Sequence, residues 1–186
     1  MRLFVALDIP QDIRARISAF AEQIRPLCPG ARWARLEGLH ITLKFIGEIP
    51  DAKLPEITQA LAGIKASPFD VKFENVGFFP SPKSPRVFWI GVHGGNSLPK
   101  LAESVSAAME PVGIAREDKA YSPHLTLARA GFKRGVDKNL KALTSLLPAE
   151  VETFGTMTAH EFFLYRSQLG RGGSTYTKLE RFGQDR

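Results

Sequence analysis

The sequence predicts an α+β fold made of two similar halves with mainly antiparallel sheets. Strand-like and helix-like segments follow in the order strand, helix, strand, helix, strand, and this order then repeats. Residues 84 positions apart also match in separate stretches of the chain, which indicates an internal duplication. A chain of 186 residues, 44% of them hydrophobic, suits one domain whose two small lobes share a core.

The first half shows five elements, each with its own signal. A short apolar run predicts a buried strand at the N-terminus, and apolar residues at helical spacing follow Pro10, a residue suited to a helix start. Polar and apolar residues alternate from His40, as in a strand, and Asp51 is suited to cap a second helix. The predicted strands cover residues 3–7, 40–46 and 69–79, and the predicted helices cover 11–27 and 51–64.

The second half begins after the proline-rich segment 80–85, which is typical of a connection. Apolar and alternating runs predict strands, and helical spacing predicts two more helices. A glycine-rich turn at 170–173 joins two closing strands. The predicted strands cover residues 86–93, 122–128, 160–166 and 175–182, and the predicted helices cover 96–109 and 137–147.

The internal repeat has a fixed offset of 84 residues. Identical residues meet at this offset in two separate segments, although short apolar strands also resemble one another by chance. The matched pairs are Arg2 with Arg86, Phe4 with Phe88, His40 with His124, Thr42 with Thr126, Leu43 with Leu127 and Gly47 with Gly131. We therefore expect one domain over residues 1–186, with one lobe at about 1–80 and the other at about 86–182. An exchange of the closing strands between the lobes is compatible with this division.

Composition narrows the function classes. Lys and Arg number 25 against 19 Asp and Glu, and the resulting net charge of +6 favours polyanionic partners such as RNA. The single cysteine, Cys28, excludes an intramolecular disulfide and fits a reducing cytoplasm. The N-terminal apolar run is too short for a signal peptide, and no apolar stretch approaches the roughly 20 residues of a membrane span. We expect a soluble cytoplasmic protein without a membrane partner.

Two similar tetrads carry the chemistry: His40-Ile41-Thr42-Leu43 and His124-Leu125-Thr126-Leu127. Side chains two apart on a strand share a face and lie about 6.6 Å apart along it, so each His and Thr can reach one phosphate. If a pseudo-two-fold axis relates the lobes, the two polar faces meet across a cleft and place two imidazoles and two hydroxyls around one anion.

This set of groups suits the opening of a cyclic phosphodiester. One imidazole can deprotonate water while the other protonates the departing oxygen, because imidazole titrates near neutral pH. Hydroxyl groups can donate to the non-bridging phosphate oxygens. A metal site is the alternative, but only two histidines share the motif face and no carboxylate joins them. We therefore expect neither a metal nor another cofactor, and we interpret His93 and His160 as structural or exposed.

With these residues in place, the sequence resembles the 2H phosphoesterase superfamily, which is named for its two histidines. The flanking segments resemble one group within it, the RNA 2′,3′-cyclic phosphodiesterases, also called 2′-5′ RNA ligases. The segments that carry the resemblance are RLFVALDIP, RWARLEGLHITLKFIGE, PSPKSPRVFWIGV, YSPHLTLAR and FLYRSQLGRGGSTYTKLERF. They extend over nearly the whole chain.

The resemblance implies a bilobal fold with an active-site groove between the lobes and metal-independent hydrolysis of 2′,3′-cyclic phosphate ends to 2′-phosphates. It implies that His40 donates the proton to the leaving 3′ oxygen and that His124 accepts the proton of water. Thr42 and Thr126 would then bind the phosphate.

Two further residues follow from the resemblance. Arg129 matches an arginine that contacts the phosphate in relatives, but strict alternation places it on the face opposite Thr126. This role requires the strand to end or to bulge before Arg129; otherwise Arg129 is a surface cation. Phe45 matches a position where an aromatic ring can stack on a base, and its alternative role is a core residue.

The partner implied is RNA or a nucleotide with a 2′,3′-cyclic phosphate end, with tRNA fragments among the candidates. We expect a monomer, because a closed two-lobed domain has no evident need of a partner. Three alternatives stay open: reversible 2′-5′ RNA ligation at the same site, a non-catalytic RNA- or nucleotide-binding module, and a metal-dependent phosphohydrolase.

Overall fold

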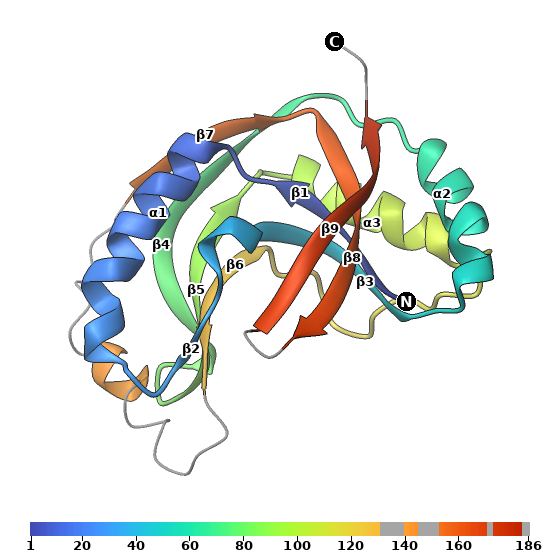
Figure 1. The fold of residues 1–186 in the computed structure, drawn as a ribbon. Helices are drawn as coiled ribbons and strands as arrows, with labels where there is room; N and C mark the ends of the chain where they lie inside the picture. Colours follow the sequence, from blue (N-terminus) through green and yellow to red (C-terminus); the bar gives the residue numbers. More distant parts are fainter. Residues whose placement is uncertain (131–139, 145–152, 171–172, 184–186) are drawn as a thin grey trace.

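The computed structural model describes residues 1–130, 140–144, 153–170 and 173–183. It contains two antiparallel sheets with helices packed outside them, which confirms the predicted α+β class (Figure 1). Buried residues of both sheets and of the helices form one main hydrophobic core. Across the described ranges, no helix combines the length and the apolar character that a membrane crossing requires.

The first sheet has the strand order β3-β1-β8-β9. Its strands are β1 (Arg2–Asp8), β3 (His40–Glu48), β8 (Glu161–Gly170) and β9 (Gly173–Gly183). Every residue from Leu3 to Leu7 is buried, because one face of β1 meets the main core and the other a second, small cluster. The small cluster consists of Phe4, Ala6, Phe163 and Tyr165.

The second sheet has the strand order β2-β6-β5-β4-β7. Its strands are β2 (Arg32–Trp33), β4 (Phe69–Ser81), β5 (Ser84–His93), β6 (His124–Arg129) and β7 (Thr153–Ala159). The alternation analysis missed β2 and β7. The proline-rich segment 80–85 is not a linker but the end of a hairpin, because Pro80 pairs with Pro85 and only Pro82 and Lys83 form the turn.

Sheet membership does not follow chain order. Most of β4 lies before residue 80, yet it pairs with β5 and β7 in the second sheet, while β8 and β9 return to the first sheet. Apart from the short β2 at one edge of the second sheet, each sheet has a motif strand paired to a neighbour (β3 with β1, β6 with β5), followed by two further strands. The division into lobes at about 1–80 and 86–182 stays a prediction about domains.

The helices cover the outer faces of the sheets (Figure 1). α1 (Gln11–Ile24) packs against the second sheet, where Phe20 meets Phe88 and Phe154. α3 (Ser97–Met109) contacts β3 and α2 (Leu54–Ala62). The predicted helix at 11–27 ends earlier than expected because residues 25–27 tighten into a 3₁₀ turn containing Pro26.

Three further short helical segments in the described residues lie outside the long helices. Residues 51–53 form a 3₁₀ turn before α2, and residues 36–38 form another just before β3. Of the predicted helix at 137–147, residues 140–144 are helical, and its other positions lie outside the described residues. Leu140 and Leu143 are fully buried, as an inward-facing helix side requires.

The sheet register corrects one part of the repeat. Phe45 and Arg129 lie 84 residues apart, yet their strand partners, Phe4 in β1 and Val87 in β5, lie 83 apart. The offset of 84 therefore relates β3 to β6, whereas β1 and β5 are related by 83. The match of Phe4 with Phe88 was wrong, because one residue of slip moves a side chain to the other face.

The two phenylalanines accordingly serve different purposes. The ring of Phe4 lies 4.5 Å from the ring of His40, on the motif face of the first sheet. Phe88 instead lies in the main core, 6.5 Å from Phe20 of α1 between ring centroids. Shared strand composition produced this apparent match.

Candidate active site

The two tetrads begin β3 and β6, which occupy equivalent positions beside β1 and β5 in their sheets. In both, the His and Thr side chains are half-buried and the two apolar side chains are fully buried. The burial order is the same in the six residues that start at His40 and in the six that start at His124. The expected alternation, with His and Thr on one face, is therefore present in β3 and in β6.

A β-bulge interrupts this alternation at the same place in each strand. Thr42 pairs with Ala6 while Lys44 pairs with Val5, so Leu43 is the extra residue. In β6, Leu127 is the extra residue between the pairs formed by its neighbours. A bulge shifts the following side chains to the opposite face.

The bulges decide where Phe45 and Arg129 lie. Both come two residues after the bulged leucine and return to the face of the His and Thr side chains. Arg129 is exposed, and the bulge that its phosphate role requires is present. Phe45 is 52% exposed, so the alternative of a core residue was wrong.

Contacts between the halves bring the two tetrads side by side. β3 and β6 contact each other (Figure 1). The half-buried Tyr121, three residues before His124, donates a hydrogen bond from its hydroxyl to the Thr42 carbonyl at 3.0 Å. On the other side, the Ala34 N–H donates to the Leu127 carbonyl at 2.8 Å. The chain that leads into each tetrad is thus bonded to the opposite tetrad.

The two motif histidines have the same tautomer-fixing contact. His40 Nδ1 lies 2.7 Å from the Gly38 carbonyl, and His124 Nδ1 lies 2.8 Å from the Ser122 carbonyl. Since a carbonyl only accepts, Nδ1 carries the proton in both neutral rings. Nε2 is then the atom that can accept a proton or, once protonated, donate one.

Aromatic rings enclose His40. Its ring lies 4.5 Å from Phe4, 4.9 Å from Tyr176 and 5.9 Å from Tyr165 between centroids. Burial lowers the pKa of His40 to about 4, although the Gly38 carbonyl and the Asp8 carboxylate act in the opposite direction. Without a bound anion, His40 is neutral at physiological pH.

His124 is less enclosed. One described ring, Phe79, meets it edge to face at 5.0 Å. Burial lowers the pKa of His124, and the positive charge of Arg129 lowers it further, against the effect of the Ser122 carbonyl. The charged neighbours of the two histidines therefore differ: at His40 the Asp8 carboxylate raises the pKa and the Arg14 guanidinium lowers it, whereas at His124 the charge of Arg129 lowers the pKa.

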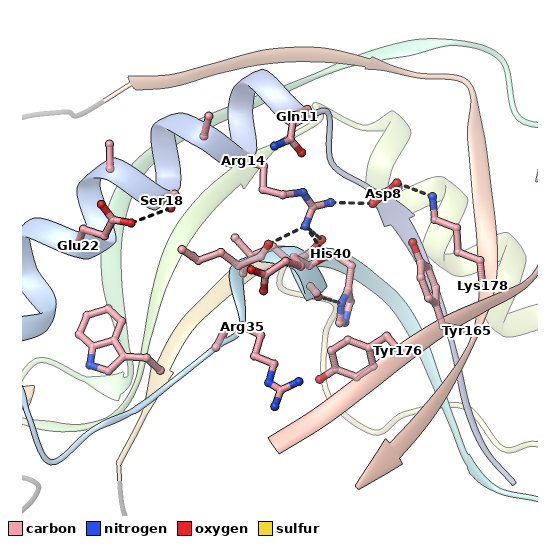
Figure 2. A pocket seen from close by; sticks show the side chains of 18 of the residues that line it. Asp8, Gln11, Arg14, Ser18, Glu22, Arg35, His40, Tyr165, Tyr176 and Lys178 are labelled. Atoms are coloured by element: carbon pink, nitrogen blue, oxygen red, sulfur yellow. Dashed lines mark hydrogen bonds and ion pairs between the residues drawn. The ribbon is translucent and has the colours of Figure 1, made fainter. Parts of the chain in front are cut away.

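Arg14 of α1 holds the segment before His40, and the sequence analysis did not single it out. Its guanidinium donates to the carbonyls of Leu36, Glu37 and Leu39 at 2.7, 2.8 and 3.3 Å. It also donates to Asp8 at 3.0 Å, and Asp8 is the strand partner of His40 (Figure 2). Arginine alone among side chains offers this many fixed donors, and its helical position gave no sign of it.

His40 also lines a groove of about 1260 Å³ between α1, residues 33–40 and β9 (Figure 2). Of the other two histidines, His93 is exposed and His160 is half-buried beside Glu161 at 4.0 Å, as expected of residues outside the motif. Among the residues that the structure describes, no three His, Cys, Asp or Glu side chains are grouped as metal ligands.

Comparisons with known proteins agree with this arrangement. Residues 7–89 match the family model described as LigT like Phosphoesterase. Over 182 residues, the chain is 38% identical to an RNA 2′,3′-cyclic phosphodiesterase of Archaeoglobus fulgidus, covering 98% of this chain and 99% of that one. A Methanocaldococcus jannaschii protein of the same name is 33% identical over 180 residues, 97% of this chain and 99% of that one.

This chain belongs to the LigT-like phosphoesterase family. The resemblance found in the sequence is thereby confirmed. The crystal structure of Escherichia coli LigT complexed with 3′-AMP also superposes on it, with a TM-score of 0.80 and 25% identity. The alignment covers 100% of this chain and 98% of that one, so the shared fold includes both tetrads.

We expect Arg14→Ala to destabilise the fold by about 2–3 kcal/mol, because the Leu36, Glu37 and Leu39 carbonyls and Asp8 lose a charged donor. The stability of Arg14→Lys should lie between those of the wild-type protein and Arg14→Ala, since an ammonium group cannot reproduce the planar set of donors of a guanidinium. Urea unfolding of each variant measures the change.

The matched control is Arg16→Ala on the same helix. Arg16 is 59% exposed, pairs loosely with Asp12 at 3.8 Å and donates one long hydrogen bond to the Phe154 carbonyl at 3.4 Å, so its loss should change stability by no more than about 1 kcal/mol. Equal losses of stability in the two alanine variants would contradict the role of Arg14 in holding the segment before His40.

Proposed function

We propose that this protein hydrolyses 2′,3′-cyclic phosphate ends of RNA or nucleotides to 2′-phosphomonoesters without a metal. The observation that carries the proposal is the pair of His-Thr tetrads on contacting strands, each with the same bulge and the same Nδ1 contact. Relatives named as RNA 2′,3′-cyclic phosphodiesterases support it, as does the LigT structure with 3′-AMP.

In this mechanism, His124 acts as the base and His40 as the acid. His124 Nε2 takes a proton from the water that attacks phosphorus, and protonated His40 Nε2 gives a proton to the 3′ oxygen as its bond to phosphorus breaks. The Asp8 carboxylate favours the charged His40 ring, against the effects of burial and Arg14, and Arg129 favours the neutral His124 ring. The product keeps its phosphate on the 2′ oxygen.

Thr42, Thr126 and Arg129 would hold the phosphate. Each threonine hydroxyl can donate to a non-bridging oxygen, where negative charge grows in the transition state. The Arg129 guanidinium, on the same face because of the bulge, can offset that charge. The half-exposed ring of Phe45 can stack on the adjoining base.

The same residues can serve 2′-5′ ligation. If a 5′-hydroxyl takes the place of water, His124 accepts its proton, the oxygen bonds to phosphorus, and the bond to the 3′ oxygen breaks as His40 protonates that oxygen, which leaves a 2′-5′ linkage. We further propose that tRNA fragments are among the RNA substrates and that the monomer is the active unit. A cytoplasmic location stays a prediction from the sequence.

Removing either imidazole should abolish most of the activity. We expect His40→Ala and His124→Ala each to lower kcat by about 10²–10⁴-fold, because each removes one proton transfer. The assay is cleavage of an RNA with a 2′,3′-cyclic phosphate end, with the product analysed for 2′- against 3′-phosphate. His93→Ala, at an exposed position, is the matched control and should keep full activity.

The His experiment also separates the alternatives. Wild-type rates in either motif variant would rule out the two-histidine mechanism. A parent protein that binds the RNA but shows no turnover would instead be a non-catalytic binding module.

Chelation should leave the reaction unchanged. Protons are moved by imidazoles and charge is offset by Arg129 and the threonine hydroxyls, so dialysis against EDTA should alter kcat less than about twofold. Metal analysis of the purified protein accompanies the assay. Loss of activity on chelation, restored by one divalent metal, would favour the metal-dependent phosphohydrolase.

The pH profile of kcat/KM should be bell-shaped with its maximum below pH 6.5. One imidazole must be neutral and the other protonated, so the maximum lies midway between the two pKa values of the free enzyme. Burial lowers both pKa values from 6.5, that of His40 to about 4. A bound phosphate anion raises both again, so kcat should peak at a higher pH than kcat/KM.

Initial rates at about half-unit steps from roughly pH 4 to 9 give both profiles. A kcat/KM maximum on the alkaline side of neutrality, or identical profiles for kcat and kcat/KM, would contradict this account.

A further inference from the structure

The groove beside His40 is larger than the phosphate and ribose require. Its volume of about 1260 Å³ exceeds the roughly 300–1,000 Å³ of ordinary small-molecule sites. It runs along α1 from Gln11 past Ala15, Ser18 and Ala19 to Arg25. The small side chains in this stretch leave the helix surface open as one wall of the groove.

The groove extends well beyond one nucleotide. From Arg14 to Arg25 the chain advances about 16 Å at the helical rise of 1.5 Å per residue. A stacked strand advances about 3.4 Å per nucleotide. Several nucleotides can therefore lie along α1.

The lining combines cations with aromatic rings, as single-stranded nucleic-acid sites do. The cations are Arg14, Arg25, Arg35 and Lys178, and the rings include Trp33, Tyr165 and Tyr176. Acidic side chains are also present at Asp8, Glu22 and Glu37. Asp8 is already offset, because Arg14 contacts it at 3.0 Å and Lys178 at 2.5 Å.

The far end of the groove has a fixed ring. Trp33 Nε1 donates to the Cys28 carbonyl at 3.3 Å, and the ring packs edge to face on Phe88 at 6.2 Å. The Arg25 guanidinium lies over the Trp33 ring, 5.7 Å from its centroid. Both residues line the groove, so a cation and a held aromatic plane are available together to a phosphate and its base.

The direction of the strand follows from the chemistry. If His40 protonates the 3′ oxygen, the terminal ribose lies on the His40 side of the phosphate. The rest of the RNA is attached to that ribose through its 5′ oxygen and must leave on the same side. Of the two motif histidines, His40 is the one that lines the groove.

We propose that this groove binds the RNA nucleotides on the 5′ side of the cyclic phosphate and makes an oligonucleotide a better substrate than a mononucleotide. The proposal rests on the proposed function. Arg25 and Arg35 then act as binding residues for phosphates upstream of the terminal nucleotide, and Trp33 as a stacking plane.

The test compares a cytidine 2′,3′-cyclic phosphate mononucleotide with a single-stranded tetranucleotide that has the same end. For the wild-type protein we expect kcat/KM to be about tenfold or more higher for the tetranucleotide, mainly through KM. The double variant Arg25→Gln/Arg35→Gln should reduce that ratio to about threefold or less. It should also lower the salt dependence of tetranucleotide KM by about one to two in slope.

The matched control is Arg16→Gln. Arg16 lies on α1, is 59% exposed and is not part of the groove lining, so Arg16→Gln removes one positive charge from another face of the same helix. This is half of the charge change in the double variant, and the control should keep the wild-type ratio. A second readout is fluorescence anisotropy with a labelled tetranucleotide ending in a 3′-phosphate, which offers no cyclic ester to open.

Each outcome decides a different point. Hydrolysis of both substrates without a length preference, or a preference that the double variant retains, would overturn the groove proposal and leave the proposed function standing. Absence of hydrolysis with both substrates would overturn the proposed function, and the anisotropy measurement would then test the groove proposal by itself. Weaker tetranucleotide binding in the double variant supports the groove, and unchanged binding overturns it.

Discussion

The bulges at Leu43 and Leu127 bring Phe45 and Arg129 to the strand face that already carries the motif His and Thr side chains. A strand without a bulge would still place His and Thr on one face, but it would turn the residue three positions after the threonine toward the core. With one extra residue, Phe45 and Arg129 return to the polar face while Leu43, Lys44, Leu127 and Ala128 stay buried. The bulge thus places a third side chain on the strand face of each His-Thr pair.

The same backbone carries different surroundings in the two halves. Across the sheet, His40 pairs with Asp8, whereas His124 pairs with Gly91. A side chain at Gly91 would lie within 2.5 Å of the Glu74 carbonyl, so no counterpart of Asp8 fits there. The two tetrads thus carry equivalent imidazoles in unequal surroundings: burial lowers both pKa values, Asp8 counteracts it at His40, and Arg129 adds to it at His124. An acid and a base need that inequality, because two identical sites would have no preferred proton position.

Patterns local in sequence were predictable, and contacts between distant segments were not. The tetrads, their shared face and the α+β class follow from residue spacing alone. The offset of 83 between β1 and β5 was hidden because Phe4 and Phe88 happen to match, and only the ladder register separates them. Arg14 was hidden because its partners lie more than 20 residues away, in a turn whose carbonyls carry no sequence signature. The bulge in β6, by contrast, was predictable as a condition, because strict alternation places Arg129 opposite Thr126 unless the strand ends or bulges between them.

A histidine with a pKa of about 4 is at first sight a poor proton donor. The rings of Phe4, Tyr165 and Tyr176 that exclude water from His40 cause this, because burial disfavours the charged form. The same exclusion strengthens the attraction between an imidazolium and a phosphate anion, since charges interact more strongly where water is absent. In the proposed mechanism, the empty site disfavours the proton on His40 and the bound diester would favour it. Burial then ties protonation of His40 to the presence of substrate, and Asp8 limits how far the pKa falls in its absence.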